Sequence, residues 1–153
     1  MIAKNVMNRN VVSIKPNDTL RDAVILMVKH SISGLPVIDE DKNIVGIISQ
    51  SDVLRHGKRP FILETVDLLE ILLYEQSPEN YEKELKIALD LKIKDVMTKG
   101  IITVLESTPA GKIAHLMISN KINRVPVIRD GKLVGIIGRE DIIKAIAKIG
   151  KNT

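Results

Sequence analysis

Residues 34–39 read GLPVID and residues 46–52 read GIISQSD, and both blocks recur in the second half of the chain. There, residues 124–129 read RVPVIR and residues 135–141 read GIIGRED. The two prolines lie 90 residues apart and the two final aspartates 89 residues apart, so the spacing between the blocks differs by one residue. A tight turn can absorb a one-residue change at little cost. The pattern predicts two copies of one structural unit.

Each copy has the hydrophobic pattern of a β-α-β-β-α unit. In the first copy, a helix with one apolar stripe follows three candidate caps, Asn17, Asp18 and Thr19. His30 is predicted to end this helix and Gly34 to break it. The predicted elements are a β-rich run, the helix, two strands around a turn and a second helix, at residues 11–14, 20–30, 37–38, 44–48 and 49–55.

The second copy repeats this order. A β-rich run at residues 101–104 precedes an apolar helical stripe, and Asp130-Gly131 is a strong signal for a tight hairpin turn. A closing helix is predicted over residues 140–149, with Gly150 ending it. A unit of two or three strands buries too little surface to be stable alone. We therefore expect an α+β fold in which the two units pack sheet to sheet with pseudo-two-fold symmetry.

The segment between the copies is expected to form two helices. The first covers the apolar residues between Phe61 and Leu73. The second begins at Ser77-Pro78-Glu79, where serine suits the cap and proline the first helical position. One interpretation is that these helices only lengthen the connection and cover the core. The other is that they form a surface for a dimer or a partner, because the first helix is apolar over a wide arc.

Composition restricts the classes of function. The chain of 153 residues is 44% hydrophobic and 27% charged. It has no cysteine and no apolar run long enough to span a bilayer. We therefore expect a cytoplasmic globular protein. The net charge of +4 favours anionic ligands, but aromatic residues are only 2%, which argues against nucleic acid. The three histidines are scattered, and there is no catalytic triad, paired-carboxylate site or GxxxxGK loop. We predict no metal site and no catalytic residue.

The order of these motifs resembles the cystathionine-β-synthase (CBS) domain. The first copy begins with a Val-Met pair, which is followed by a β-rich run, an amphipathic helix and then the LPVID and GIISQSD blocks. Two such copies in tandem resemble a CBS pair, also called a Bateman module. The resemblance places CBS repeat 1 at residues 1–57, an inter-repeat helical segment at 58–92 and CBS repeat 2 at 93–153. It implies a regulatory module, not an enzyme, that binds AMP, ADP, ATP or S-adenosylmethionine in clefts between the repeats. It also implies a disc-shaped homodimer that controls a partner protein, whose identity the resemblance leaves open.

The GIISQSD block carries the chemistry expected of such a site. It lies at a strand-to-helix junction, where free backbone N–H groups and the helix dipole favour a phosphate. Ser49 and Ser51 offer hydroxyls, and the Asp52 carboxylate can accept hydrogen bonds from both ribose hydroxyls. The same residues also fit a capping box, in which Ser49 caps the helix and Asp52 returns a hydrogen bond. The occurrence of the block within a repeat favours the ligand site.

The family pattern supplies the remaining candidates for both clefts. In repeat two, Gly138 replaces the serine, while Asp141 is kept and Arg124 can reach a phosphate, unless it is a solvated surface charge. The ligand-binding residues predicted for the first cleft are Val11, Val12, Ser13, Ile32, Ser33, Gly34, Pro36, Ile47, Ser49, Ser51 and Asp52. Those predicted for the second cleft are Ile101, Ile102, Thr103, Ile122, Asn123, Arg124, Pro126, Ile136, Arg139 and Asp141.

Three alternatives stand beside an adenosine sensor. The clefts can be vestigial, in which case the protein is a scaffold that acts through its dimer and its inter-repeat helices. Nucleic-acid binding rests only on the basic charge and predicts a steep salt dependence. Catalysis has the weakest support. Ligand binding separates the sensor from the scaffold. Each of the two aspartates is predicted to lie near an exposed helix start and to serve one adenosine site.

Overall fold

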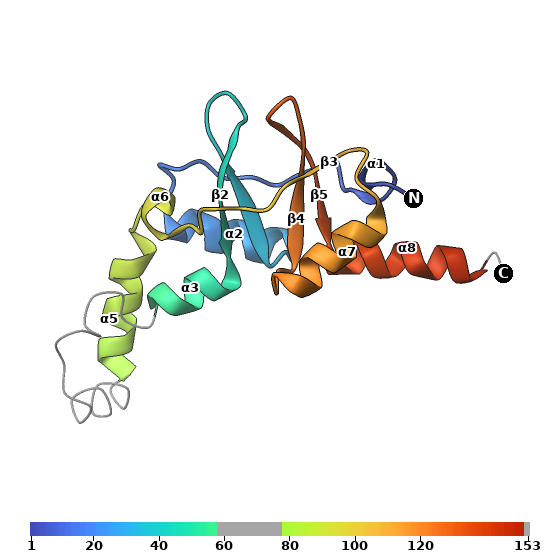
Figure 1. Cartoon of the computed structure of the whole chain (residues 1–153). Coiled ribbons are helices and arrows are strands. Elements are labelled where there is room, and N and C mark those ends of the chain that lie inside the picture. Colours follow the sequence, from blue (N-terminus) through green and yellow to red (C-terminus); the bar gives the residue numbers. More distant parts are fainter. Residues whose placement is uncertain (58–77, 152–153) are drawn as a thin grey trace. The chain divides into compact units, whose positions relative to one another are not determined.

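The computed structural model describes residues 1–57 and 78–151 (Figure 1). These residues form an α+β structure with two small sheets, which confirms the predicted class. The chain divides into two compact units. The repeat-one unit comprises Ser13–Val37 and Val45–Lys99, and the repeat-two unit comprises Met1–Val12, Ile38–Ile44 and Gly100–Thr153. The packing of the two units sheet to sheet stays a prediction.

The repeat-one unit is built around the two-stranded sheet β1-β2. Ile14 adds a single parallel bridge to this sheet, opposite Val37. Leu20, Leu35 and Ile48 are fully buried, so one face of the helix and both strands contribute to the core. The elements in chain order are α2 (Leu20–His30), β1 (Gly34–Ile38), β2 (Ile44–Ser49), α3 (Gln50–Gly57), α5 (Pro78–Leu89) and α6 (Ile93–Val96).

Helix α2 begins at a capping box. Thr19 is the N-cap: its hydroxyl accepts a hydrogen bond from the backbone N–H of Asp22, and the Asp22 carboxylate accepts one from the backbone N–H of Thr19 at 2.9 Å. The helix ends at His30, as predicted, but Gly34 does not break it. Ser31 ends it by adopting the left-handed conformation at φ 52°, and Gly34 is already the first residue of β1.

Between the repeats, the structure describes the second of the two predicted helices. Helix α5 begins at Pro78, the expected first helical position. The first predicted helix, between Phe61 and Leu73, and the predicted cap Ser77 lie outside the described residues.

The repeat-two unit has the three-stranded sheet β3-β4-β5, in which β3 is parallel to β4 and β4 is antiparallel to β5. Asp130 and Gly131 have φ values of 51° and 76°, which is the left-handed geometry that the predicted hairpin turn requires. Ile113, Val125 and Ile137 are fully buried in its core. The elements are α1 (Ala3–Val6), β3 (Val104–Leu105), α7 (Ala110–Ser119), β4 (Arg124–Arg129), β5 (Lys132–Gly138) and α8 (Arg139–Lys151).

Two further local predictions are wrong, and two short helices were not predicted. Most of the two β-rich runs is not in strands, because only Ile14 and Val104 find a backbone partner there. Gly150 does not end the last helix, since a glycine in a final turn costs only about 1 kcal/mol and α8 continues to Lys151. The four-residue helices α1 and α6 were not predicted, because segments this short carry no readable period.

The lead-in of each repeat pairs with the hairpin of the other repeat. The backbone of Asn8 exchanges hydrogen bonds of 2.9 and 3.0 Å with Ile136, and Thr98 exchanges bonds of 2.8 and 3.0 Å with Ile47. This exchange explains why residues 1–12 belong to the repeat-two unit and residues 93–99 to the repeat-one unit.

A glycine lies beneath each exchanged segment. A Cβ atom on Gly46 would lie 2.5 Å from the Met97 sulfur, and one on Gly135 would lie 2.5 Å from the Met7 sulfur. Real Cβ atoms do not approach that closely, so the glycine of each Gly-Ile-Ile block is required for the close packing of a methionine.

Candidate functional site

Each repeat joins its hairpin to a helix at a turn that carries a carboxylate. We call residues 49–52, the end of β2 and the first turn of α3, the first junction. We call residues 138–141, the end of β5 and the first turn of α8, the second junction. Each junction lies within one compact unit. The two are equivalent in sequence, but their carboxylates have different surroundings.

At the first junction, the Asp52 carboxylate is satisfied by the protein itself. Its Oδ2 accepts hydrogen bonds from the backbone N–H of Ser49 at 2.8 Å and from the Ser49 hydroxyl at 3.0 Å. Its Oδ1 accepts from the Thr98 hydroxyl at 3.1 Å and, at 3.5 Å, from the Arg55 guanidinium. Asp52 is 1% exposed. The capping-box interpretation therefore describes this turn, and the expectation of an exposed aspartate is wrong here because four donors enclose it.

Thr98 is the contact that sequence reasoning missed. It is 46 residues from Asp52 and reaches it because the exchanged lead-in pairs with Ile47. A signal was present, since Val96-Met97-Thr98 repeats Val6-Met7-Asn8. The repeat marked the segment as structurally important but did not indicate which hairpin it joins.

At the second junction, the Asp141 carboxylate has a single donor. Its Oδ2 accepts a hydrogen bond from the backbone N–H of Gly138 at 2.8 Å, and the residue is half-buried. Gly138 has no hydroxyl, and Asn8, the counterpart of Thr98, uses its side-chain oxygen to accept a bond from Asn10. Within residues 1–57 and 78–151, no donor reaches Asp141 Oδ1. This oxygen can therefore accept a hydrogen bond from a ligand.

Each junction is also tied to the segment that precedes the first hairpin strand. The backbone N–H of Gln50 donates to the Ser33 carbonyl at 3.0 Å, and that of Arg139 donates to the Asn123 carbonyl at 3.1 Å. Ser33 and Asn123, two of the predicted ligand-binding residues, are thus held beside the helix starts.

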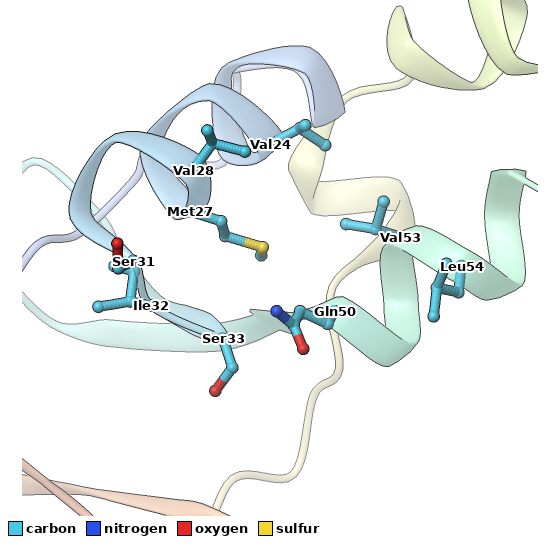
Figure 2. Close-up of a pocket in the computed structure, with 9 residues that line it drawn as sticks. All are labelled: Val24, Met27, Val28, Ser31, Ile32, Ser33, Gln50, Val53 and Leu54. Atoms are coloured by element: carbon cyan, nitrogen blue, oxygen red, sulfur yellow. The ribbon is translucent and has the colours of Figure 1, made fainter.

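A groove of about 730 Å³ runs between α2 and α3 of the repeat-one unit (Figure 2). Figure 2 shows Val24, Met27 and Val28 on one side and Val53 and Leu54 on the other, with Ser31, Ile32 and Ser33 along the segment after α2. Most of these side chains are apolar, and Ser31, Ser33 and Gln50 are the polar residues that line the groove.

The repeat-two unit has a counterpart of about 450 Å³ between α7 and α8. Its residues Ala114, Met117 and Ile118 occupy the positions of Val24, Met27 and Val28, and Ile142 and Ile143 occupy those of Val53 and Leu54. Lys121 and Arg139 also line it. Of the predicted ligand-binding residues, these two grooves contain only Ile32, Ser33 and Arg139.

The other predicted residues lie in several environments. Pro36 and Pro126 are fully buried in β1 and β4, where they pack in the core. Val11 and Val12 belong to the repeat-two unit, whereas Ile32 and Ile47, with which the prediction grouped them, belong to the repeat-one unit. Ser51 is exposed on the first turn of α3. Residues 11–13 and 101–103 are half-buried and lie outside helices and strands, and they include Ser13, Ile101, Ile102 and Thr103.

The described residues contain neither a cluster of metal-binding side chains nor a membrane-spanning helix. In that part of the chain, no three His, Cys, Asp or Glu side chains are grouped so that they could hold a metal ion. None of the helices there combines the length and the apolar character needed to span a membrane.

The chain is similar to known proteins over most of its length. The CBS domain family model matches residues 3–59 and 93–148. The chain is 36% identical to the protein MJ1426 of Methanocaldococcus jannaschii over 95% of this chain and 91% of that protein. A solved CBS domain of a CBS domain-containing membrane protein from Sphaerobacter thermophilus is 34% identical, with a TM-score of 0.71 over 94% of this chain and 86% of that one.

CBSX2 of Arabidopsis thaliana is a third similar protein, and its structure was solved in complex with AMP. It is 27% identical to this chain, with a TM-score of 0.74, and the match covers 97% of this chain and 98% of the solved one. The chain spans 62% of full-length CBSX2.

Proposed function

This chain belongs to the CBS domain family, with two tandem copies of the domain, and on that premise we propose that it is a regulatory module that binds adenosine compounds. The candidate ligands are AMP, ADP, ATP and S-adenosylmethionine. The ligand acts by favouring one arrangement of the repeats or of a dimer, which requires that its affinity differ between the two arrangements. The module controls a partner protein and catalyses no reaction itself, and its cysteine-free composition fits the cytoplasm.

The observation that carries this proposal is the structure of CBSX2 with AMP, which matches this chain over nearly the full length of both. The chemistry of the junctions supports it. Each junction places a carboxylate in the first turn of a helix, where a carboxylate suits ribose hydroxyls and the helix start suits a phosphate. We propose that the full set of residues predicted for the two clefts contacts the ligand.

Isothermal titration calorimetry with AMP, ATP and S-adenosylmethionine tests the proposal. The protein must first be freed of co-purified ligand, and its folded state must be checked by circular dichroism. We expect at least one of the three compounds to bind. If the folded, ligand-free protein binds none of them, the sensor proposal is wrong.

We also propose that the protein is a homodimer that uses the apolar helix faces. Val28 on α2 and Ile118 on α7 are each 75% exposed, and Leu54 and Ile143 on the following helices are also exposed. These side chains border the equivalent grooves of the two units. Exposed apolar faces of this kind are typical of protein interfaces.

The same faces favour a second candidate function, that of a scaffold which binds a partner and no nucleotide. The scaffold and the sensor would both be dimers, but the clefts of the scaffold would bind no adenosine compound. Failure of all three adenosine compounds to bind, with a stable dimer retained, is the outcome that favours the scaffold.

A further inference from the structure

We propose that the homodimer is antiparallel, so that the groove of the repeat-two unit in one copy packs against the groove of the repeat-one unit in the second copy. This inference rests on the proposed homodimer and adds to it the pairing of its faces, which the family resemblance leaves open. A closed dimer with two-fold symmetry then has two such contacts, and both join unlike grooves. The alternative is a parallel dimer, in which each groove meets the same groove of the second copy.

The two grooves share apolar residues but differ in charge. Lys121 and Arg139 line the repeat-two groove, and the residues at the equivalent positions of the repeat-one groove are Ser31 and Gln50. Among the described residues, no charged side chain lines the repeat-one groove. The positive charge is therefore confined to one of two otherwise equivalent surfaces.

The two cations of the repeat-two groove have no carboxylate of their own in the part of the chain that the structure describes. The ion pairs found there involve other side chains, such as Lys144 with Glu140 at 3.2 Å on α8. A parallel dimer would bring the Lys121 and Arg139 of both copies together in one apolar contact. Four positive charges would then face one another where little water screens them, which opposes that arrangement.

An antiparallel dimer gives the same cations a better environment. Each pair of cations then lies opposite Ser31, Ser33 and Gln50, which line the repeat-one groove. Their hydroxyl and amide oxygens accept hydrogen bonds, and none of the three carries a charge that repels a cation. Unlike pairing therefore avoids the repulsion and provides acceptors for both cationic groups.

The sizes of the grooves also favour unlike pairing. The repeat-one groove has a volume of about 730 Å³ and the repeat-two groove one of about 450 Å³. Ile146 on α8 lines the smaller groove and is 58% exposed, whereas repeat one has Gly57, the last residue of α3, at the equivalent position. The larger groove can receive the projecting isoleucine. A parallel dimer would place two large grooves against each other and leave more apolar surface in contact with water.

Cysteine crosslinking tests the pairing directly, because the chain has no cysteine of its own. Val28 and Ile118 occupy equivalent positions in the two grooves, and each is 75% exposed, so a substitution there does not reach the core. Val28→Cys and Ile118→Cys are prepared in the full chain, and one of them carries a tag that identifies the mixed dimer by its mass. A short bis-maleimide crosslinker is applied to each variant alone and to a refolded equal mixture. We expect a covalent dimer that joins position 28 to position 118 in the mixture, and none in either variant alone.

Gln50→Glu provides a second test, because its effect has opposite signs in the two arrangements. In an antiparallel dimer the new carboxylate lies opposite Lys121 and Arg139, so the dissociation constant of the dimer is expected to fall by roughly twofold to tenfold at low salt. In a parallel dimer the two new carboxylates would face each other and weaken the dimer. Analytical ultracentrifugation measures the dissociation constant, and the gain should be lost at high salt.

The matched control for this variant is Ser107→Glu. It makes the same change in net charge at an exposed residue that lines neither groove. It should leave the dissociation constant of the dimer within about twofold of the wild-type value. An equal gain in both variants would show that the effect comes from net charge, and it would contradict the pairing.

The outcomes separate this inference from the proposals on which it rests. A monomer in light scattering would overturn both the homodimer and the pairing. If the protein is a dimer, the pairing alone is wrong when either cysteine variant crosslinks to itself, when the mixture gives no crosslink, or when Gln50→Glu weakens the dimer. Adenosine binding is measured separately by calorimetry, so its failure refutes the sensor and not the pairing.

Discussion

At the scale of single residues, Ser49 and Gly138 show how one side chain decides what a carboxylate does. Ser49 supplies two of the hydrogen bonds that hold Asp52, and Gly138 supplies one to Asp141. A capping serine thus ties the Asp52 carboxylate into the hydrogen bonds of the fold, whereas a glycine at the same position gives the Asp141 carboxylate a single backbone donor.

We predict that Ser49→Ala lowers the free energy of unfolding by about 1 kcal/mol, because it removes the cap of α3 and a donor to a buried carboxylate. Urea unfolding followed by circular dichroism measures this change. Ser51→Ala is the matched control, since Ser51 is exposed on the same helix turn, and it should change the stability by less than about 0.5 kcal/mol. Equal effects of the two substitutions would contradict the capping role.

Gly46 provides a second prediction at this scale. Gly46→Ala should destabilise the fold by about 1–3 kcal/mol, because the added carbon would lie 2.5 Å from the Met97 sulfur and 3.1 Å from the Thr98 carbonyl oxygen. The control is Gly111→Ala on α7, where nothing lies within 4 Å and the gain in helix propensity should stabilise by about 0.5–1 kcal/mol. Thermal unfolding of both variants distinguishes a packing effect from the general effect of replacing a glycine.

At the scale of elements, the start of α2 makes stability depend on pH. The backbone N–H and the hydroxyl of Thr19 donate to the Asp22 carboxylate and hold its pKa below the ordinary value of 3.8. A depressed pKa in the folded state gives stability that is present above the pKa of the unfolded state and is lost as the pH falls through the folded value. The contribution is therefore present at neutral pH and disappears in acid, below about pH 4.

We predict that Thr19→Val raises the pKa of Asp22 toward its ordinary value, since valine cannot donate the side-chain hydrogen bond. Titration of the Asp22 carboxyl carbon by nuclear magnetic resonance measures this pKa. The pKa of Glu106 is held low by a different donor, the Arg129 guanidinium, and serves as the internal control. An unchanged pKa at Asp22 would contradict the hydrogen bond that the Thr19 hydroxyl donates to the Asp22 carboxylate.

At the scale of the whole molecule, the exposed apolar helix faces predict an assembly. The double variant Val28→Glu and Ile118→Glu should convert the proposed homodimer into a monomer, because it places charges on the two most exposed apolar positions beside the grooves. Light scattering coupled to size-exclusion chromatography measures the mass. Lys112→Glu, which changes an exposed charge on α7, should leave the dimer intact.

The sequence alone determined features that depend on neighbours along the chain. The sequence predicted the apolar stripe and cap of α2, the start of α5 at Pro78 and the Asp130-Gly131 turn. These features depend on the helical period, on the fixed φ of the proline ring and on a left-handed φ, which are all local properties of the chain. The tandem repeat was also visible in the sequence, and with it the family. These features were sufficient for the fold class.

The tertiary structure alone decided which segments meet. Residues 11–13 have high β propensity but no strand partner in the structure, since pairing depends on what lies alongside. Thr98 and Asp52 are 46 residues apart and are joined because the lead-in of one repeat pairs with the hairpin of the other. No local pattern specifies such an exchange. For this reason the sequence identified two equivalent aspartates, and only the structure showed that, among the described residues, the Asp52 carboxylate has four donors and the Asp141 carboxylate has one.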